Sequence, residues 1–263
     1  MATATTALPR ISVRHGVRVW RRNWAVFRRF AIAEVGPIAV EPLLVLGALG
    51  VGLGTYVTFS DDRGSYLAFI APGIIGAYSM FAAFFECTYG SYTRMDIQRL
   101  YNAMIATPLG IDDVFLGEAL WGATRALFSA TIILIVISLL GFVDSPLALV
   151  IPVFALLVGL LFASVGLLFT AFAVSYWTFN YAISLFIFPM YFFSGVFFPL
   201  DRYPELIERI AWILPLTPYV AAIRELVVGQ LTLTTLWAVL YLIALTAVIY
   251  SVALIKMRHR LIR

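Results

Sequence analysis

Residues Leu147–Val174 have the sequence LALVIPVFALLVGLLFASVGLLFTAFAV, which contains no charged side chain. A transmembrane helix needs about 20 consecutive, mostly apolar residues, so this stretch is long enough to cross a bilayer. In the whole 263-residue chain, 62% of the residues are hydrophobic and 12% are charged. In soluble domains, about half of the residues are apolar and about a quarter are charged. The sequence therefore predicts an integral membrane protein and excludes a water-soluble globular domain.

Five more apolar stretches have helical length, so the sequence predicts six transmembrane helices. The six are roughly Pro37–Val57, Tyr66–Tyr89, Leu116–Leu140, Leu147–Val174, Trp177–Phe198 and Leu233–Met257. Most arginines lie before the first span, between the second and third spans, and in the C-terminal tail. Because cytoplasmic segments are enriched in Lys and Arg, we expect a multi-pass protein of the cell inner membrane with both termini in the cytoplasm. We expect an all-α fold with a cytoplasmic interface helix in residues 1–35 and a single six-helix membrane domain in residues 36–263.

The segment before the first span has the pattern of a basic amphipathic helix. Trp20, Trp24 and Phe27 belong to a series of apolar residues that recur every three or four positions, and arginines occupy much of the rest. Such a helix is expected to lie in the membrane interface and to meet anionic headgroups. Two roles remain open: the helix anchors the first span, or Trp20 and Trp24 form part of a substrate gate.

The connection between the second and third spans predicts a short helix from about Thr93 to Thr107, ended by Pro108 and Gly110. Its apolar face consists of Ile97, Leu100, Tyr101, Met104 and Ile105. One possibility is that this face packs on the protein's own cytoplasmic surface. We favour the other, in which a partner protein accepts the helix in a groove, because groove-binding helices carry apolar residues at this spacing.

Two short helices are predicted on the external side, between the fifth and sixth spans. Pro204 and Thr217-Pro218 look like helix starts, Pro215 ends the first helix, and Gly229 ends the second. Each helix would be about 16 Å long, too short to cross a bilayer core of about 30 Å. Arg224 and nearby charges make a full crossing costly. The pair is expected to be re-entrant or interfacial and to act either as a lid or as an external gate.

Four ionisable residues lie at or inside the spans, where charge is costly and usually faces a partner or a pathway. They are Glu41, Glu86, Glu118 and Arg125. Arg125 is a candidate for binding a substrate phosphate or sugar, but we favour a structural ion pair with Glu86.

The fifth span is rich in aromatic residues, among them Tyr191, and Phe197 follows at its exit. Aromatic rings stack on sugars and contact acyl chains, although core packing produces the same composition.

Several kinds of chemistry have no residues to support them. Lys256 is the only lysine, so the phosphate-binding pattern G-x-x-x-x-G-K-[ST] is absent. The two histidines lie outside the spans, and Cys87 is the single cysteine. We therefore assign no catalytic and no metal-binding residues, and we expect no nucleic-acid partner. The helices must obtain energy from another protein.

Several stretches resemble one family of membrane proteins. They include Glu41-Pro-Leu-Leu44, Phe84-Phe-Glu-Cys-Thr-Tyr-Gly-Ser-Tyr-Thr-Arg-Met95, Tyr101-Asn-Ala-Met-Ile-Ala-Thr-Pro-Leu109 and Phe193-Ser-Gly-Val-Phe-Phe-Pro199. Together with Pro204, Pro215 and Arg224, which follow later in the sequence, these stretches are similar to the ABC-2 class of ABC transporter permeases. The resemblance covers the whole chain and is nearest to the NodJ-like branch, which is associated with lipo-oligosaccharide export.

The resemblance implies the permease subunit of an ATP-driven exporter of a lipo-oligosaccharide, glycolipid or polysaccharide-type substrate. It implies two ATP-binding cassette (NodI-like) partner subunits that hold ATP and Mg, a second permease in a dimer, either a homodimer, which we favour, or a heterodimer, and contact with membrane lipids. This chain would bind no cofactor and would not itself be an enzyme. The residues that would couple it to the ATPase are Arg94, Met95, Ile97, Leu100, Tyr101, Met104 and Ile105. Candidates for the substrate path or gate are Trp20, Trp24, Glu41, Glu86, Arg125, Tyr191, Phe197 and Arg224.

Two alternative functions remain open. One is a drug or polyketide exporter of the same class. The other is a membrane-embedded lipid-modifying enzyme, which is disfavoured because the spans lack a catalytic constellation.

Overall fold

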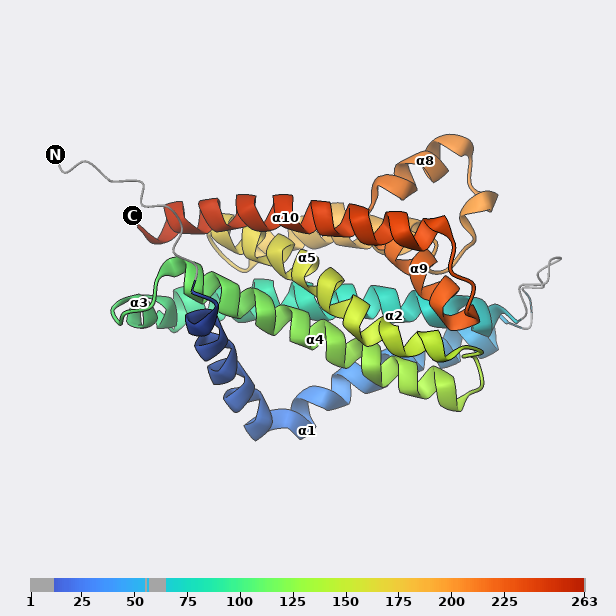
Figure 1. Cartoon of the computed structure of the whole chain (residues 1–263), viewed down its shortest axis with the longest axis horizontal. Helices are drawn as coiled ribbons and strands as arrows, with labels where there is room; N and C mark the ends of the chain where they lie inside the picture. The colour runs from blue at the N-terminus through green and yellow to red at the C-terminus, as the bar shows by residue number, and fades with distance from the viewer. Residues whose placement is uncertain (1–11, 55, 57–64, 263) are drawn as a thin grey trace.

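The computed structural model describes residues 12–54, 56 and 65–262, and every regular element within these ranges is helical (Figure 1). The long helices run side by side as a bundle. In chain order the elements are α1 (Val13–Gly52), α2 (Tyr66–Phe85), η1 (Glu86–Gly90), η2 (Thr93–Ile97), α3 (Leu100–Ile105), α4 (Ile111–Leu139), η3 (Pro146–Val150), α5 (Ile151–Phe172), α6 (Trp177–Ala182), η4 (Ile183–Ile187), α7 (Phe188–Phe193), η5 (Leu200–Arg202), α8 (Glu205–Ile213), α9 (Leu216–Val228) and α10 (Leu233–Leu261).

Five helices within the described ranges are long and apolar enough to cross a membrane, and they match five of the six predicted spans. The sixth prediction, Trp177–Phe198, corresponds to a helix of 17 residues, Trp177–Phe193, built from α6, η4 and α7. At 1.5 Å per residue this helix is about 25 Å long, slightly less than the hydrocarbon core. It ends early because the backbone leaves the helix at Ser194 and Gly195 takes a φ of +74°. The end of the first predicted span, at Val57, lies outside the described residues.

The centre of the bundle is formed by α4 and α5, which pack closely because small residues face each other. A methyl group added at Gly159 of α5 would lie 2.6 Å from the Cβ of Ala126 and 2.8 Å from the Cα of Ala123, both on α4. Gly122 of α4 approaches Ala163 of α5 in the same way. Small residues are what bring membrane helices together, since lipid gives no hydrophobic force between them.

One end of the bundle carries the first turns of α1, the short α3 and the C-terminal end of α10 (Figure 1). We call this the terminal end. The opposite end carries α8 and the N-terminal end of α10. The described ends of the chain therefore lie on the same side of the bundle, as an even number of crossings requires.

Helix α1 has two arms, which form a V in Figure 1. The backbone leaves helical geometry at Phe30 (φ −118°, ψ 16°), one residue after the last arginine of the basic segment. The first arm packs on α4 through Gly16, Val19 and Asn23, all of which are buried. The second arm is apolar and contains the candidate span Ala33–Gly52. The division of the chain at residue 35 remains a prediction.

The predicted helix from Thr93 to Thr107 is wrong in its bounds. The second span does not end at Tyr89 but continues through the π-helical turns η1 and η2 as far as Ile97. Thr93 lies inside this continued helix and donates its hydroxyl to the carbonyl of Tyr89. The chain then turns at Arg99, which has a φ of +50°, and α3 contains only six residues. We call residues 98–110 the ledge.

The two short helices before α10 are present, with 9 and 13 residues. Pro204 lies at the N-cap position directly before α8, and Gly229 ends α9 in the left-handed conformation (φ +86°) that glycine adopts without strain. The helices meet at 87°, so together they form either a broken span or a re-entrant pair. Pro215 precedes α9 directly, which explains why one helix ends and the next begins at this point.

Candidate functional site

A cavity of about 570 Å³ opens among the second arm of α1, α2, α4 and α7. Aromatic and aliphatic side chains form most of its wall, and three ionisable side chains interrupt that wall. Its lining residues are Ile38, Glu41, Val45, Tyr78, Phe81, Ala82, Phe85, Glu86, Gly90, Arg125, Ser129, Phe188 and Tyr191. An apolar pocket with a few convergent polar groups is the usual form of a site for an organic ligand.

Two tyrosines bring polar atoms into the apolar part of the wall. The Tyr78 hydroxyl donates a hydrogen bond of 3.3 Å to Glu41, which joins α2 to α1. The Tyr191 ring lies edge-on to Phe81 at 5.0 Å and to Phe197 at 4.8 Å between centroids. These rings offer flat faces and edges on which a sugar ring or an acyl chain can pack.

An ion-pair chain closes the cavity on one side. Arg125 lies between two carboxylates, with a nitrogen 2.7 Å from Glu34 on α1 and another 3.6 Å from Glu86 on η1. The pairing of Glu86 with Arg125 that the sequence suggested is therefore confirmed. Glu34 and Glu86 also line a second cavity of about 240 Å³, which lies under the first arm of α1. The triad Glu34–Arg125–Glu86 thus lies where the two cavities meet.

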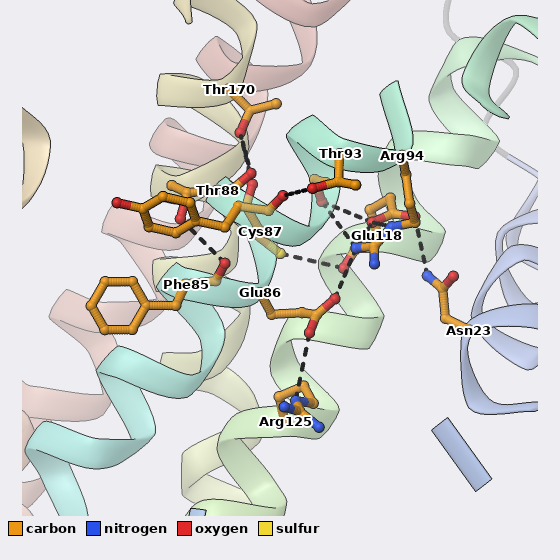
Figure 2. A network of polar contacts seen from close by, with 12 residues as sticks. Asn23, Phe85, Glu86, Cys87, Thr88, Thr93, Arg94, Glu118, Arg125 and Thr170 are labelled. Carbon is orange, nitrogen blue, oxygen red and sulfur yellow. Dashed lines mark hydrogen bonds and ion pairs between the residues drawn. The ribbon is translucent and has the colours of Figure 1, made fainter. Parts of the chain in front are cut away.

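The chain of charges continues away from the cavity through Arg94 (Figure 2). One guanidinium nitrogen of Arg94 lies 2.9 Å from Glu86 and 2.6 Å from Glu118, and a second donates to Glu118 at 3.1 Å. Glu118 is fully buried and also accepts hydrogen bonds from Asn23 (3.1 Å) and Ser91 (2.8 Å). We call Glu34, Arg125, Glu86, Arg94 and Glu118 the charge network.

A third arginine lies beside the charge network, on the first arm of α1. Arg22 donates to the amide oxygen of Asn23 at 2.9 Å. Burial is the main cause that lowers the pKa of Arg22, and the like charge of Arg94 is the second. With Arg22 included, three cations face three carboxylates, which is the balance that a buried site needs.

The local fold of the second span explains how these charges meet. A π-helical turn accommodates one extra residue and is frequent at functional sites. Glu86 and Arg94 lie in two such turns, with Gly90 between them. A methyl group at Gly90 would lie 2.8 Å from a Glu86 carboxylate oxygen and 3.3 Å from the Arg94 guanidinium, so glycine leaves room for the ion pair.

Comparison with known proteins places the chain in a family. Residues 16–228 match the family described as ABC-2 type transporter. The chain belongs to this family. It is 36% identical over 227 residues to "Nodulation protein J" of Rhizobium leguminosarum bv. trifolii, which covers 86% of each chain. It is also 38% identical over 212 residues to the protein of that name from R. leguminosarum bv. viciae, covering 81% of this chain and 82% of the relative. The protein is therefore an ABC-2 permease and a multi-pass membrane protein.

Four of the eight candidate path residues of this permease meet in the main cavity: Glu41, Glu86, Arg125 and Tyr191. Phe197 is buried directly behind Tyr191.

The two tryptophans lie elsewhere, on the first arm of α1. Trp20 donates its indole N–H to Thr124 at 2.9 Å, and Trp24 packs against Phe128 with ring centroids 5.8 Å apart. The structure therefore seats Trp20 and Trp24 on α4 and outside the cavity walls.

Arg224, the last path candidate, ties α9 to its neighbours. It donates to the carbonyl oxygen of Gly195 at 2.5 Å, and its guanidinium stacks over the Phe69 ring at 4.0 Å. Glu225 beside it accepts hydrogen bonds from the backbone and side chain of Thr232, at the start of α10.

Most of the seven candidate coupling residues face the interior of the permease. Met95 and Tyr101 are buried, and Arg94 belongs to the charge network. Met104 and Ile105 are half-buried and pack against the protein's own core, as the alternative interpretation of this helix had it. Burial also raises the pKa of the Tyr101 phenol well above its ordinary value. Ile97, with 61% of its surface exposed, is the member most open to a partner, and Leu100 is half-buried.

Several residues of the site were not among the candidates: Glu34, Tyr78, Asn23 and Ser91. Glu118 had been recognised only as an intramembrane charge. Its position seven residues before Arg125 on one helix face was a usable signal. Glu34 and Asn23 gave no such signal, because their partners lie on other helices.

Proposed function

We propose that this permease is the membrane subunit of an ATP-driven exporter that moves a lipo-oligosaccharide, or a glycolipid or polysaccharide-type substrate, outward across the cell inner membrane. The two cavities separated by the Glu34–Arg125–Glu86 triad carry this proposal. Aromatic walls suit acyl chains and sugar faces, and the charged groups suit hydroxyls or a phosphate. Relatives named Nodulation protein J at 36% and 38% identity support the same class of cargo.

Substrate would enter through the smaller cavity under the first arm of α1 and pass into the main cavity when the triad opens. It would leave near α8 and α9, whose Arg224 and Glu225 hold the external end together. The first arm of α1, which carries six arginines, begins at the terminal end, and the last turns of α10, which carry Lys256, Arg258 and Arg260, lie at that end too. By the positive-inside rule this distribution supports a cytoplasmic location for both termini.

Energy would come from two ATP-binding subunits, which would hold ATP and Mg and contact the terminal end. Arg94 offers a route for coupling, because it lies in the turn just before the ledge and pairs with Glu86 in the cavity wall. A partner that pushes the ledge would displace Arg94 and so change the charges that hold Arg125. A second copy of the permease would complete the path along α1, α2 and α7.

Substrate-stimulated ATPase activity of the reconstituted complex tests the proposed cargo. Tyr191→Ala removes a ring from the main cavity and should lower stimulation by a lipo-oligosaccharide. Tyr181→Ala removes an equally large ring from the exposed surface of α6 and should leave it unchanged. Stimulation by a planar drug or polyketide alone would favour that alternative substrate class, and lipid turnover by the isolated chain without ATP would refute export.

Docking is tested by co-purification with the ATP-binding subunit. Ile97→Asp places a charge on the exposed apolar residue nearest the ledge and should abolish co-purification. Leu206→Asp alters a comparably exposed leucine on α8 at the opposite end and should preserve it. Equal binding by both variants would contradict the proposed coupling surface.

A further inference from the structure

A separate pocket lies at the terminal end, between the last turn of α5 and the last turns of α10. Its volume is about 450 Å³, and the chain segment Ala171–Val174 forms one wall. Three basic side chains, Lys256, His259 and Arg260, form the other. None of these residues belongs to the cavity or to the charge network.

The positive charge of this pocket is only partly compensated. Arg260 donates to the carbonyl oxygens of Thr170 and Ala173 at 2.6 and 2.5 Å, and it lies 3.5 Å from Asp96, so it is held in place by the end of α5. Lys256 and His259 are exposed, and no carboxylate in the part of the chain described here lies within ion-pairing distance of either. The pocket therefore has one cation held by the end of α5 and an exposed cation, Lys256, beside it.

Apolar side chains surround the basic ones. Phe172 and Val174 are 56% and 88% exposed, and the ammonium of Lys256 lies 5.6 Å from the centre of the Phe172 ring. Both α5 and α10 are membrane-spanning helices, and these residues are at the point where the helices end. A lysine that lays its stem on an apolar surface and keeps its charge at the helix end is typical of the headgroup level of a bilayer.

We propose that this pocket binds the phosphodiester headgroup of an anionic phospholipid. The phosphate would lie between Lys256 and Arg260, and an acyl chain would cover Phe172. A soluble acidic partner would satisfy the charges but leave these apolar surfaces in water, whereas an anionic lipid satisfies both. The inference rests on this pocket alone and does not depend on what the permease exports.

The unique lysine allows a direct test on the full-length chain in uncharged detergent. Reductive methylation with ¹³C-formaldehyde labels Lys256 and the N-terminal amine while keeping their charge, and Lys256→Arg identifies the lysine signal in the NMR spectrum. We expect dihexanoyl phosphatidylglycerol to shift this signal saturably. Dihexanoyl phosphatidylcholine and inorganic phosphate at the same concentrations should leave it in place.

Single substitutions distinguish lipid binding in this pocket from nonspecific attraction of an anionic lipid to the basic surface. Arg260→Gln should weaken the phosphatidylglycerol affinity about fivefold, the value of one cation near a lipid surface. His259→Gln, which removes no side-chain hydrogen bond or ion pair among the described residues, should weaken it in the same direction even if Arg260→Gln disturbs the end of α5. The matched control is Arg99→Gln, which removes an exposed arginine from the ledge at the same end and should have little effect.

A second measurement covers the lysine itself. Native mass spectrometry should show fewer phosphatidylglycerol molecules retained by Lys256→Gln than by the wild type. Equal shifts with phosphatidylcholine or with free phosphate would overturn the lipid assignment, and so would equal losses in Arg99→Gln and Arg260→Gln. A lysine signal that responds to the ATP-binding subunit and not to phosphatidylglycerol would assign the pocket to a protein partner instead.

Discussion

Replacing Arg94 by methionine perturbs the charge network at its centre. Methionine keeps much of the side-chain length, but the fully buried Glu118 is left with only two neutral donors, Asn23 and Ser91. Removing one partner of a buried ion pair typically costs about 3–5 kcal/mol. In a chain of this size 1 kcal/mol corresponds to about 2–4 °C in Tm, so we expect the Tm to fall by about 6–20 °C. Thermal unfolding of the purified chain in detergent, followed by tryptophan fluorescence, measures this change.

The matched control for this prediction is Arg209→Met. Arg209 pairs with Glu205 at 2.5 Å on α8, but both side chains are more than three-quarters exposed, and such pairs contribute at most about 1 kcal/mol. The double variant Arg94→Met/Glu118→Gln should regain much of the lost stability, because the glutamine at position 118 is neutral and leaves no buried charge without a partner. If Arg94→Met and Arg209→Met lowered the Tm equally, burial of the network would have no energetic consequence and the reasoning would fail.

Two more predictions concern packing and access. Gly159→Ala places a methyl group 2.6 Å from the Cβ of Ala126 and should lower the free energy of unfolding by about 1–3 kcal/mol. Gly47→Ala, whose added methyl group would have nothing within 4 Å, should be neutral or stabilising. Unfolding curves of the two variants measure the difference. Cys87 is fully buried, so a water-soluble thiol reagent should leave the folded wild type unlabelled, whereas Ala82→Cys in the wall of the main cavity should be labelled. Labelling of Cys87 without denaturant, or none at Ala82→Cys, would contradict the packing or the cavity.

The membrane class and the long helices were predictable because hydrophobic length is a local property of the sequence. The span Leu147–Val174 needs no partner to be recognised, and its helix ends within two residues of the predicted position. The caps at Pro204 and Gly229 were predictable for the same reason, since proline and glycine restrict or free the backbone at their own positions. Local chemistry thus gives the elements and most of their ends.

The site was harder to predict because it depends on irregular helical geometry. Each π-helical turn adds a residue, so a face assigned with 3.6 residues per turn rotates away from its true direction after η1 and η2. Tyr101 was assigned to a face that docks a partner, and the family resemblance placed Arg94 and Met95 among the coupling residues, although all three lie toward the interior. The pairing of Glu34 with Arg125 depends on the bend at Phe30, where the sequence carries no proline.

The order of charges in the network suggests why a permease would keep so many ionisable groups buried. Each of Arg125 and Arg94 is shared by two carboxylates, so neither can move without leaving a carboxylate uncompensated. An uncompensated charge in an apolar interior is costly, so the network has few intermediate arrangements and favours movement as a unit. Arg94 borders the ledge, Arg125 lines the main cavity, and Glu86, which pairs with both, lines both cavities. A displacement at the terminal end would therefore reach the cavity walls as one concerted change, which is what the proposed coupling to an ATP-binding subunit requires.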